Sequence, residues 1–174
     1  MLTLVVGGAG SGKSACAEHL IERSDAAKRV YLATMEPFGD EAAARIEKHR
    51  AMRANKGFIT LECFTDLSGA DIPPDSAVLL EDLGNLCANE LFSPRGAGDG
   101  AAEVILRGVE HLLARCRDLV IVSNEVFTGG TDYAGDMERY LSVLAYLNRK
   151  LAALSDRVCE VSGGIATYYK GEEG

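Results

Sequence analysis

Four residues near the start of the chain have the types and spacing of a phosphate-binding loop. Gly7, Gly12, Lys13 and Ser14 fit the pattern G-x-x-x-x-G-K-[ST]. Glycines let the backbone turn tightly, so that several N–H groups point into one concavity. In such a loop the lysine bridges the outer phosphates of a nucleotide and the serine hydroxyl ligates Mg²⁺. The residues predicted to contact the phosphates are Gly7, Gly8, Ala9, Gly10, Ser11, Gly12, Lys13 and Ser14.

The segments on either side of this loop favour a nucleotide site over a glycine-rich turn without a ligand. The apolar run 2–6 predicts a strand, and residues 15–22 predict a helix. A strand, the loop and a helix in this order are the context that the motif requires. The unpaired N–H groups and the dipole at the start of the helix also favour a phosphate.

Two carboxylates follow another apolar run at the predicted end of a strand. Glu81 and Asp82 come directly after Val78, Leu79 and Leu80. A carboxylate at this position can hold Mg²⁺ directly or through water. The alternative is that an acidic residue here caps the following helix. We expect a metal site made by Ser14 with Glu81 in preference to Asp82, although both could contribute.

A basic stripe is predicted on a helix from Asp40 to about Arg53. Arg45, His49 and Arg53 are four residues apart and therefore share one face, with Arg50 beside His49. Cations on this face can bind phosphate while the imidazole acts as a base or a nucleophile. From spacing alone, a solvated basic surface is the alternative.

Strand-like and helix-like segments alternate along the chain, which predicts an α/β fold with a mostly parallel sheet and helices on both faces. We expect one domain over residues 1–174. Ligands bind beyond the carboxyl ends of such strands, so Ser123, Asn124 and Glu125 are further candidates for positioning the nucleotide. The alternative is that they make hydrogen bonds at the end of the strand. The predicted strands are 2–6, 29–32, 60–64, 77–80, 119–122, 157–161 and an edge strand at 167–169, and the predicted helices are 15–22, 40–53, 83–91, 102–115 and 136–154, with a surface loop at 93–100.

Composition limits the kinds of partner. The chain has 174 residues, 25% of them charged, and a formal net charge of −8, so we expect no nucleic-acid partner. Its five cysteines are scattered and form no C-x-x-C pair, which suits a reducing compartment. With no apolar run of about 18 residues and no signal peptide, we expect a cytoplasmic protein without a membrane span. No N-K-x-D segment is present to recognise guanine as in small GTPases.

Several segments together resemble the adenosylcobinamide kinase / adenosylcobinamide-phosphate guanylyltransferase family of cobalamin biosynthesis. The most specific of them is R-I-x-x-H-R-x-x-R, from Arg45 to Arg53. The matching segments, in chain order, are 6–14, 31–34, 40–41, 44–53, 61–62, 78–81, 89–92, 123–126 and 148–152.

The resemblance implies a RecA-like P-loop fold, a homotrimer and two reactions. Members phosphorylate the hydroxyl group on the aminopropanol arm of adenosylcobinamide, with ATP or GTP as donor. They then transfer GMP from GTP to that phosphate through a guanylylated histidine, which His49 matches, and Lys13 is expected to assist in catalysis. The resemblance adds to the nucleotide site Ala33, Thr34, Met35, Arg50, Ala51, Met52, Arg53, Glu62 and Glu81.

The chain departs from the family pattern in two places. Gly10 stands where the family usually has arginine, and the segment from Phe127 to Asp136 replaces a glycine-rich family segment. The residues leave open the kinase donor, the exact corrinoid acceptor, the number of subunits and whether both activities are retained. The alternatives are a P-loop small-molecule kinase without guanylyl transfer, or a nucleotide-binding regulatory module without catalysis.

Overall fold

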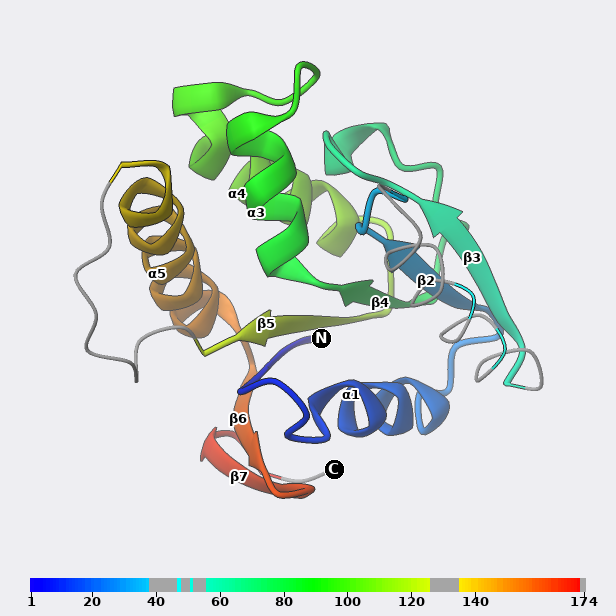
Figure 1. Ribbon diagram of the computed structural model, residues 1–174. Helices are drawn as coiled ribbons and strands as arrows, with labels where there is room; N and C mark the ends of the chain where they lie inside the picture. Colours follow the sequence, from blue (N-terminus) through cyan, green and yellow to red (C-terminus); the bar gives the residue numbers. More distant parts are fainter. Residues whose placement is uncertain (38–46, 48–50, 52–55, 126–134, 173–174) are drawn as a thin grey trace.

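The computed structural model describes residues 1–37, 47, 51, 56–125 and 135–172. Over these residues it shows a seven-stranded sheet with helices on both faces (Figure 1). The prediction of an α/β fold with a mostly parallel sheet is therefore confirmed. The strands are β1 (Leu2–Gly7), β2 (Arg29–Ala33), β3 (Phe58–Glu62), β4 (Ala77–Glu81), β5 (Asp118–Asn124), β6 (Arg157–Ser162) and β7 (Ile165–Lys170). The helices are α1 (Lys13–Glu22), α3 (Leu83–Phe92), α4 (Ala101–Leu113) and α5 (Asp136–Leu154), with short 3-10 turns at Leu67–Gly69 and Gly98–Gly100.

The strand order is β3-β2-β4-β5-β1-β6-β7. All neighbouring strands are parallel except β6 and β7, which form an antiparallel hairpin at one edge. The strand before the glycine loop, β1, pairs with β5 and β6, so β5 separates it from β4. The carboxyl ends of β1, β2, β4 and β5 consequently lie along one edge of the sheet, where a ligand can meet residues from all four strands.

Alternate residues of the central strands supply two apolar layers. Leu4 and Leu80 face α3, α4 and α5, whereas the adjacent Val5 and Leu79 face α1. All four side chains are at most 1% exposed. Strands buried on both faces are apolar without alternation, which is why these runs read as continuous hydrophobic segments. Of the helices that the structure describes, α3, α4 and α5 lie together on one face and α1 lies on the other (Figure 1).

The boundaries of several predicted elements differ from the structure by a few residues. The strand expected at 60–64 begins at Phe58 and ends at Glu62, because the Phe58 ring packs edge-on against Tyr31 at a centroid distance of 6.5 Å. The loop expected at 93–100 ends in a 3-10 turn. The carboxylate of Glu90, which is 2% exposed, accepts a hydrogen bond from the backbone N–H of Ala97 at 3.0 Å and so fixes this segment.

The predicted helix at 40–53 falls mostly outside the described residues. Of its members only Glu47 and Ala51 are described, and both are helical and exposed. None of the helices described has the length and apolar character needed to cross a membrane.

Candidate nucleotide-binding site

The loop between β1 and α1 has a backbone that glycine favours. Gly10 and Gly12 have φ values of 70° and 95°, in the left-handed region that other residues rarely adopt. Gly12 occupies the N-cap position of α1, and no side chain caps the helix there. The first N–H groups of α1 are therefore not satisfied by a capping side chain, and the positive end of the helix dipole faces the loop. This arrangement favours an anion.

The loop also packs tightly against the turn between β6 and β7. A Cβ atom on Gly7 would lie 2.6 Å from the carbonyl oxygen of Val161, so glycine is required at this close approach. The backbone N–H of Gly164 donates to the carbonyl of Ser11 at 2.8 Å. The hydroxyl of Ser11 is buried and has no hydrogen-bond partner in the described part of the chain. A buried hydroxyl in this state is suited to a ligand that enters the loop.

Lys13 and Ser14 open α1 with their polar atoms turned toward the loop and the sheet. The Lys13 ammonium donates to the carbonyl of Gly8 at 3.0 Å, so it lies over the loop. The Ser14 hydroxyl donates a short hydrogen bond to Glu81 Oε1, at the carboxyl end of β4. A hydroxyl and a carboxylate side by side are the hard oxygen ligands that Mg²⁺ prefers, so these residues fit that ion.

Asp82 has a different environment from Glu81. Its Oδ1 accepts the backbone N–H of Asn85 at 2.7 Å, and its Oδ2 accepts the Asn85 amide at 3.2 Å. Asp82 is thus the N-cap of α3, which is the alternative expected for an acidic residue after a strand. The structure brings Glu81, rather than this capping carboxylate, into contact with Ser14.

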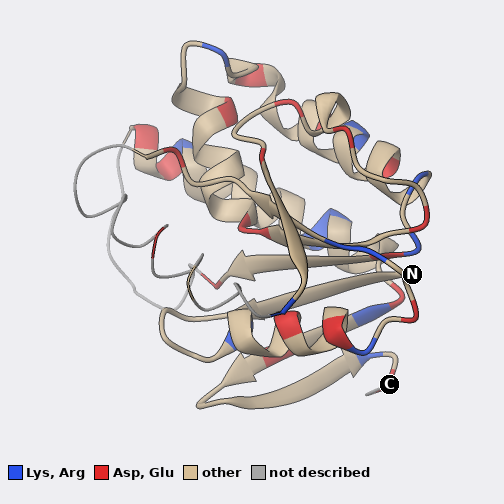
Figure 2. Ribbon diagram, turned by 90° about the vertical axis from the view of Figure 1, so that its right-hand side faces the viewer, with Lys and Arg blue, Asp and Glu red and all other residues tan. Residues whose placement is uncertain are grey.

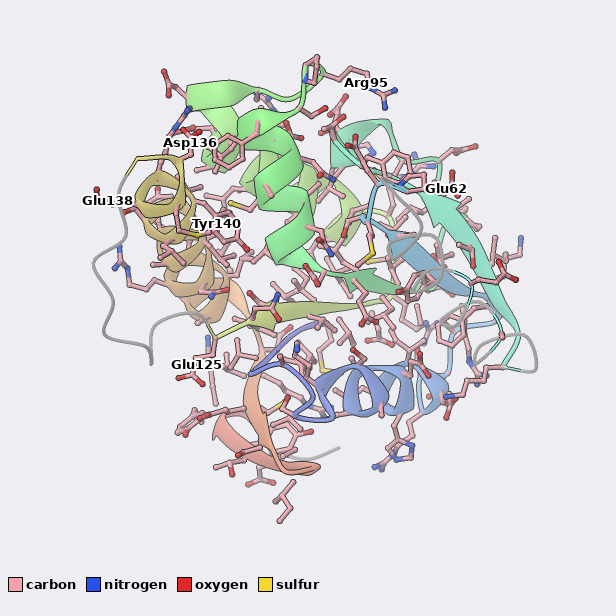
Figure 3. The ribbon with its side chains drawn as sticks, in the orientation of Figure 1. Glu62, Arg95, Glu125, Asp136, Glu138 and Tyr140 are labelled. Carbon is pink, nitrogen blue, oxygen red and sulfur yellow. The ribbon has the colours of Figure 1, made fainter. Side chains whose placement is uncertain are left out.

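The predicted nucleotide contacts after β2 lie beside this edge of the sheet. Thr34 is fully buried; its hydroxyl accepts from the Asp82 N–H at 2.8 Å and donates to the Asp82 carbonyl at 2.9 Å. The Thr34 side chain therefore joins the ends of β2 and β4. Ala33 and Met35 are half-buried, while Glu62 is exposed at the end of β3 (Figure 3).

Asn124 and Glu125 continue β5 next to the loop. Asn124 pairs with Gly7 in the sheet register, and the backbone N–H of Glu125 donates to the Gly7 carbonyl at 3.2 Å. The hydroxyl of Ser123 donates to Asn148 Oδ1 on α5 at 2.7 Å. Of the two roles expected for Ser123, its hydroxyl has the structural one, because it makes a hydrogen bond at the end of the strand.

Tyr140 is a residue of this edge that sequence reasoning missed. A Cβ on Gly84 would lie 2.9 Å from the Tyr140 hydroxyl, 3.0 Å from Asn124 Nδ2 and 3.2 Å from Asp82 Oδ1, so these polar atoms converge on the start of α3. Burial, with the nearby Asp82 carboxylate, raises the pKa of Tyr140 to about 12, which keeps the phenol protonated. Tyr140 lies four residues before Leu144 on α5, and this spacing in the sequence could have predicted that Tyr140 faces inward.

The basic stripe lies outside the described residues. This holds for His49 and for Arg45, Arg50, Met52 and Arg53, so only Ala51 of that predicted cluster has a described position, and it is exposed. In the part of the chain that the structure describes, Lys and Arg positions are interspersed with Asp and Glu positions along the ribbon (Figure 2).

Comparison with known proteins shows the family to which the chain belongs. The model of a family described as cobinamide kinase / cobinamide phosphate guanyltransferase matches residues 3–168. The bifunctional adenosylcobalamin biosynthesis protein CobU of Salmonella typhimurium is 35% identical over 98% of this chain and 100% of its own length. CobU of Escherichia coli is 34% identical with the same coverage, and the bifunctional adenosylcobalamin biosynthesis protein CobP of Pseudomonas aeruginosa is 30% identical over 99% of each chain.

Solved structures agree at the level of the fold. An ATPase from the type III secretion system of pathogenic bacteria superposes with a TM-score of 0.53 at 9% identity, covering 96% of this chain and 56% of the ATPase. At this identity the likeness concerns the arrangement of the sheet, the loop and the helices.

Proposed function

Because the chain belongs to the cobinamide kinase / cobinamide phosphate guanyltransferase family, we propose that it is a bifunctional enzyme of adenosylcobalamin biosynthesis. Its first reaction phosphorylates the hydroxyl of the aminopropanol arm of adenosylcobinamide. Its second transfers GMP from GTP to the new phosphate and releases pyrophosphate. The observation that carries this proposal is the glycine loop, with Lys13 and Ser14 at the start of α1 and Glu81 beside them.

Both reactions use the same triphosphate cradle. The loop N–H groups and the start of α1 bind the phosphates, and the Lys13 ammonium neutralises the negative charge that grows on the leaving group. Ser14 and Glu81 would hold Mg²⁺, which supplies charge neutralisation on the phosphate oxygens when it is bound.

The second reaction needs a nucleophile, and His49 is the proposed one. Its imidazole attacks the α-phosphorus of GTP, the bond to the bridging oxygen of the β-phosphate breaks, and pyrophosphate leaves. The acceptor phosphate then attacks the guanylylated histidine and regenerates the imidazole. Arg45, Arg50 and Arg53 share the predicted helix with His49 and neutralise charge in the transition state.

The test is mass spectrometry of the protein after incubation with GTP. We expect one added GMP, located on His49, and the same label from GTP that carries ³²P at the α-position. His49→Ala should abolish the label and GMP transfer while retaining most of the kinase rate, and Lys13→Ala should lower both rates. His19→Ala is the matched control, because His19 is an exposed histidine on α1.

Each alternative has its own outcome. Phosphorylation of cobinamide without any label on the protein would indicate a kinase that lacks guanylyl transfer. Hydrolysis of GTP with cobinamide unchanged would indicate a nucleotide-binding module. Equal loss of both activities in His49→Ala would assign His49 to nucleotide binding or structure instead of covalent catalysis. Running the kinase step with ATP and with GTP identifies its donor.

The same proposal includes a cytoplasmic homotrimer. The trimer is implied by the family resemblance, and the compartment is the one expected from the composition of the chain. Light scattering of the purified protein measures the number of subunits.

A further inference from the structure

A pocket of about 460 Å³ lies beside the binding loop, on the face of the sheet that α5 covers. Val6 forms part of its wall and directly precedes the first glycine of the loop. The pocket therefore lies next to the proposed triphosphate site, near the carboxyl ends of β1 and β5, where ligands of open α/β sheets bind. Its lining residues are Val6, Glu125, Ala145, Asn148, Arg149 and Glu160.

Two polar side chains of this pocket already have partners. Asn148 Oδ1 accepts the Ser123 hydroxyl at 2.7 Å, and Glu160 Oε2 accepts the Tyr169 hydroxyl at 2.7 Å. The side chains of Glu125 and Arg149 are exposed and make no hydrogen bond or ion pair with the residues that the structure describes. Within the described part of the lining, Glu125 is therefore left as an acceptor and Arg149 as a donor to meet a ligand beside the apolar Val6 and Ala145.

The charges of the pocket restrict the ligand. The described lining residues include two carboxylates, Glu125 and Glu160, and one guanidinium, Arg149, so a dianionic phosphate ester is disfavoured. A neutral group that both donates and accepts hydrogen bonds is favoured. The acceptor of the kinase step has such a group, because its arm carries a hydroxyl and the amide that joins the arm to the corrin ring.

Glu125 is also well placed for proton transfer. Its backbone N–H donates to the carbonyl of Gly7 at 3.2 Å, and Asn124 before it pairs with Gly7. Figure 3 shows Glu125 at the end of β5, on the opposite side of the molecule from Glu62 on β3. A carboxylate beside the loop can accept the proton of a hydroxyl that attacks a phosphate bound there.

We propose that this pocket binds the hydroxyl-bearing arm of the corrinoid acceptor and that Glu125 is the general base of the kinase step. This inference rests on the proposed function and assigns its acceptor site. The acceptor oxygen forms a bond to the γ-phosphorus, the bond from that phosphorus to the bridging oxygen breaks, and the nucleoside diphosphate leaves. The hydroxyl proton passes to the Glu125 carboxylate. Arg149 donates to the amide carbonyl of the arm.

The proposal also gives an order to the two reactions. Once the arm is phosphorylated, its new negative charges lie beside the carboxylates of Glu125 and Glu160. Like charges at short range repel, so the phosphorylated arm leaves the pocket before guanylyl transfer. Glu125 should therefore matter for the first reaction and not for the second.

The experiment measures the two steps separately in Glu125→Gln. We expect the kinase kcat to fall about 10²-fold or more. Labelling of the protein by GTP, and GMP transfer to ready-made adenosylcobinamide phosphate, should keep their wild-type rates. Glu125→Asp should restore part of the kinase rate. Glu138→Gln is the matched control, because Glu138 is exposed at the start of α5, away from the pocket (Figure 3).

Ala145→Phe tests the pocket itself by filling it. We expect the KM for cobinamide to rise at least tenfold with the KM for the donor nucleotide unchanged. Ala153→Phe, at an exposed position near the end of the same helix, should have wild-type constants. Wild-type kinase rates in Glu125→Gln, or equal losses in kinase and labelling rates, would overturn the role of Glu125. An unchanged KM for cobinamide in Ala145→Phe would overturn the assignment of this pocket to the corrinoid arm.

A failure of the proposed function is distinguishable from a failure of this inference. Wild-type protein that does not phosphorylate cobinamide contradicts the proposed function. Equilibrium binding of cobinamide then tests the pocket: weaker binding by Ala145→Phe than by wild type supports it, and equal or absent binding overturns it.

Discussion

The ammonium nitrogen of Lys56 lies 2.5 Å from a carboxylate oxygen of Glu18 on α1. Glu18 is 4% exposed, and Glu22 on the next turn contributes a second oxygen at 3.3 Å. The hydrogen bond to Glu18 is the main cause that raises the pKa of Lys56. Lys56 lies two residues before the start of β3, so this contact fixes the chain before β3 against the helix that begins with Lys13.

We expect Lys56→Met to destabilise the protein by about 1–3 kcal/mol, because it leaves the Glu18 carboxylate buried without its cation; the partial exposure of Lys56 reduces the effect. Urea unfolding at pH 7.5 measures the change. Because the folded pKa of Lys56 is raised, its contribution is complete below about pH 10.4 and is lost as the pH rises through the folded pKa. Lys28→Met, at an exposed lysine nearby, is the control. Equal losses in both variants would contradict the prediction.

Glu81 and Asp82 are neighbours for which we expect opposite phenotypes. Glu81→Gln should raise the Mg²⁺ concentration for half-maximal kinase activity about tenfold or more, with little change in stability. Asp82→Ala removes the cap of α3 and should cost about 1 kcal/mol of unfolding free energy, with the Mg²⁺ dependence retained. Metal titrations and urea unfolding of both variants measure these effects. The reverse pattern would assign the metal to Asp82.

Substitution of two glycines in the binding loop should also have different effects on nucleotide binding. A methyl group on Gly7 meets the Val161 carbonyl, so Gly7→Ala should cost about 1–3 kcal/mol and abolish nucleotide binding. A methyl group on Gly10 would have open space around it, so Gly10→Ala should retain nucleotide binding. The strain of its positive φ should lower the free energy of unfolding by about 1–2 kcal/mol. Thermal unfolding measures the change in stability, and titration with a fluorescent GTP analogue measures nucleotide binding. Retained binding in Gly7→Ala would show that the loop can shift.

The buried thiols should make stability fall at alkaline pH. Burial raises the pKa of Cys87 to about 12 and those of Cys63 and Cys116 to about 11. An unfolded thiol ionises near pH 8.5, so above that pH the unfolded state loses protons that the folded state keeps. Each thiol then removes at most about 1.4 kcal/mol of stability per pH unit up to its folded pKa.

Urea unfolding between pH 8 and pH 10 in reducing buffer measures this decline. Cys87→Ala should flatten the curve, after correction for the cavity that it creates. An equally steep decline in Cys87→Ala and wild type would exclude this thiol as a cause.

The fold and the phosphate loop could be predicted because their signals are local. The run before Gly7 is apolar on both faces of the sheet, and the loop motif specifies its own strand and helix. The family could also be predicted from the sequence, because its most specific motif, from Arg45 to Arg53, is contiguous. The comparisons confirm that assignment.

Other features depend on contacts between distant segments. Phe58 joined β3 because of Tyr31, which lies in another strand and carries no signal in the local pattern. Thr34 satisfies the backbone of Asp82, so its type alone could not separate a ligand contact from a structural bond. The convergence of Tyr140 and Asn124 on Gly84 required the packing of α5 against α3, which sequence spacing does not give.

The place of β1 in the sheet has a consequence for synthesis. This strand leaves the ribosome before both of its partners, since Leu2 pairs with Leu119 and Thr3 with Arg157. Parallel pairing over such separations requires the closure of long loops and is slow. The nascent chain therefore carries its glycine loop without the two neighbouring strands of β1 until β5 and β6 emerge, and the capacity to capture a nucleotide arises only after both have been synthesised.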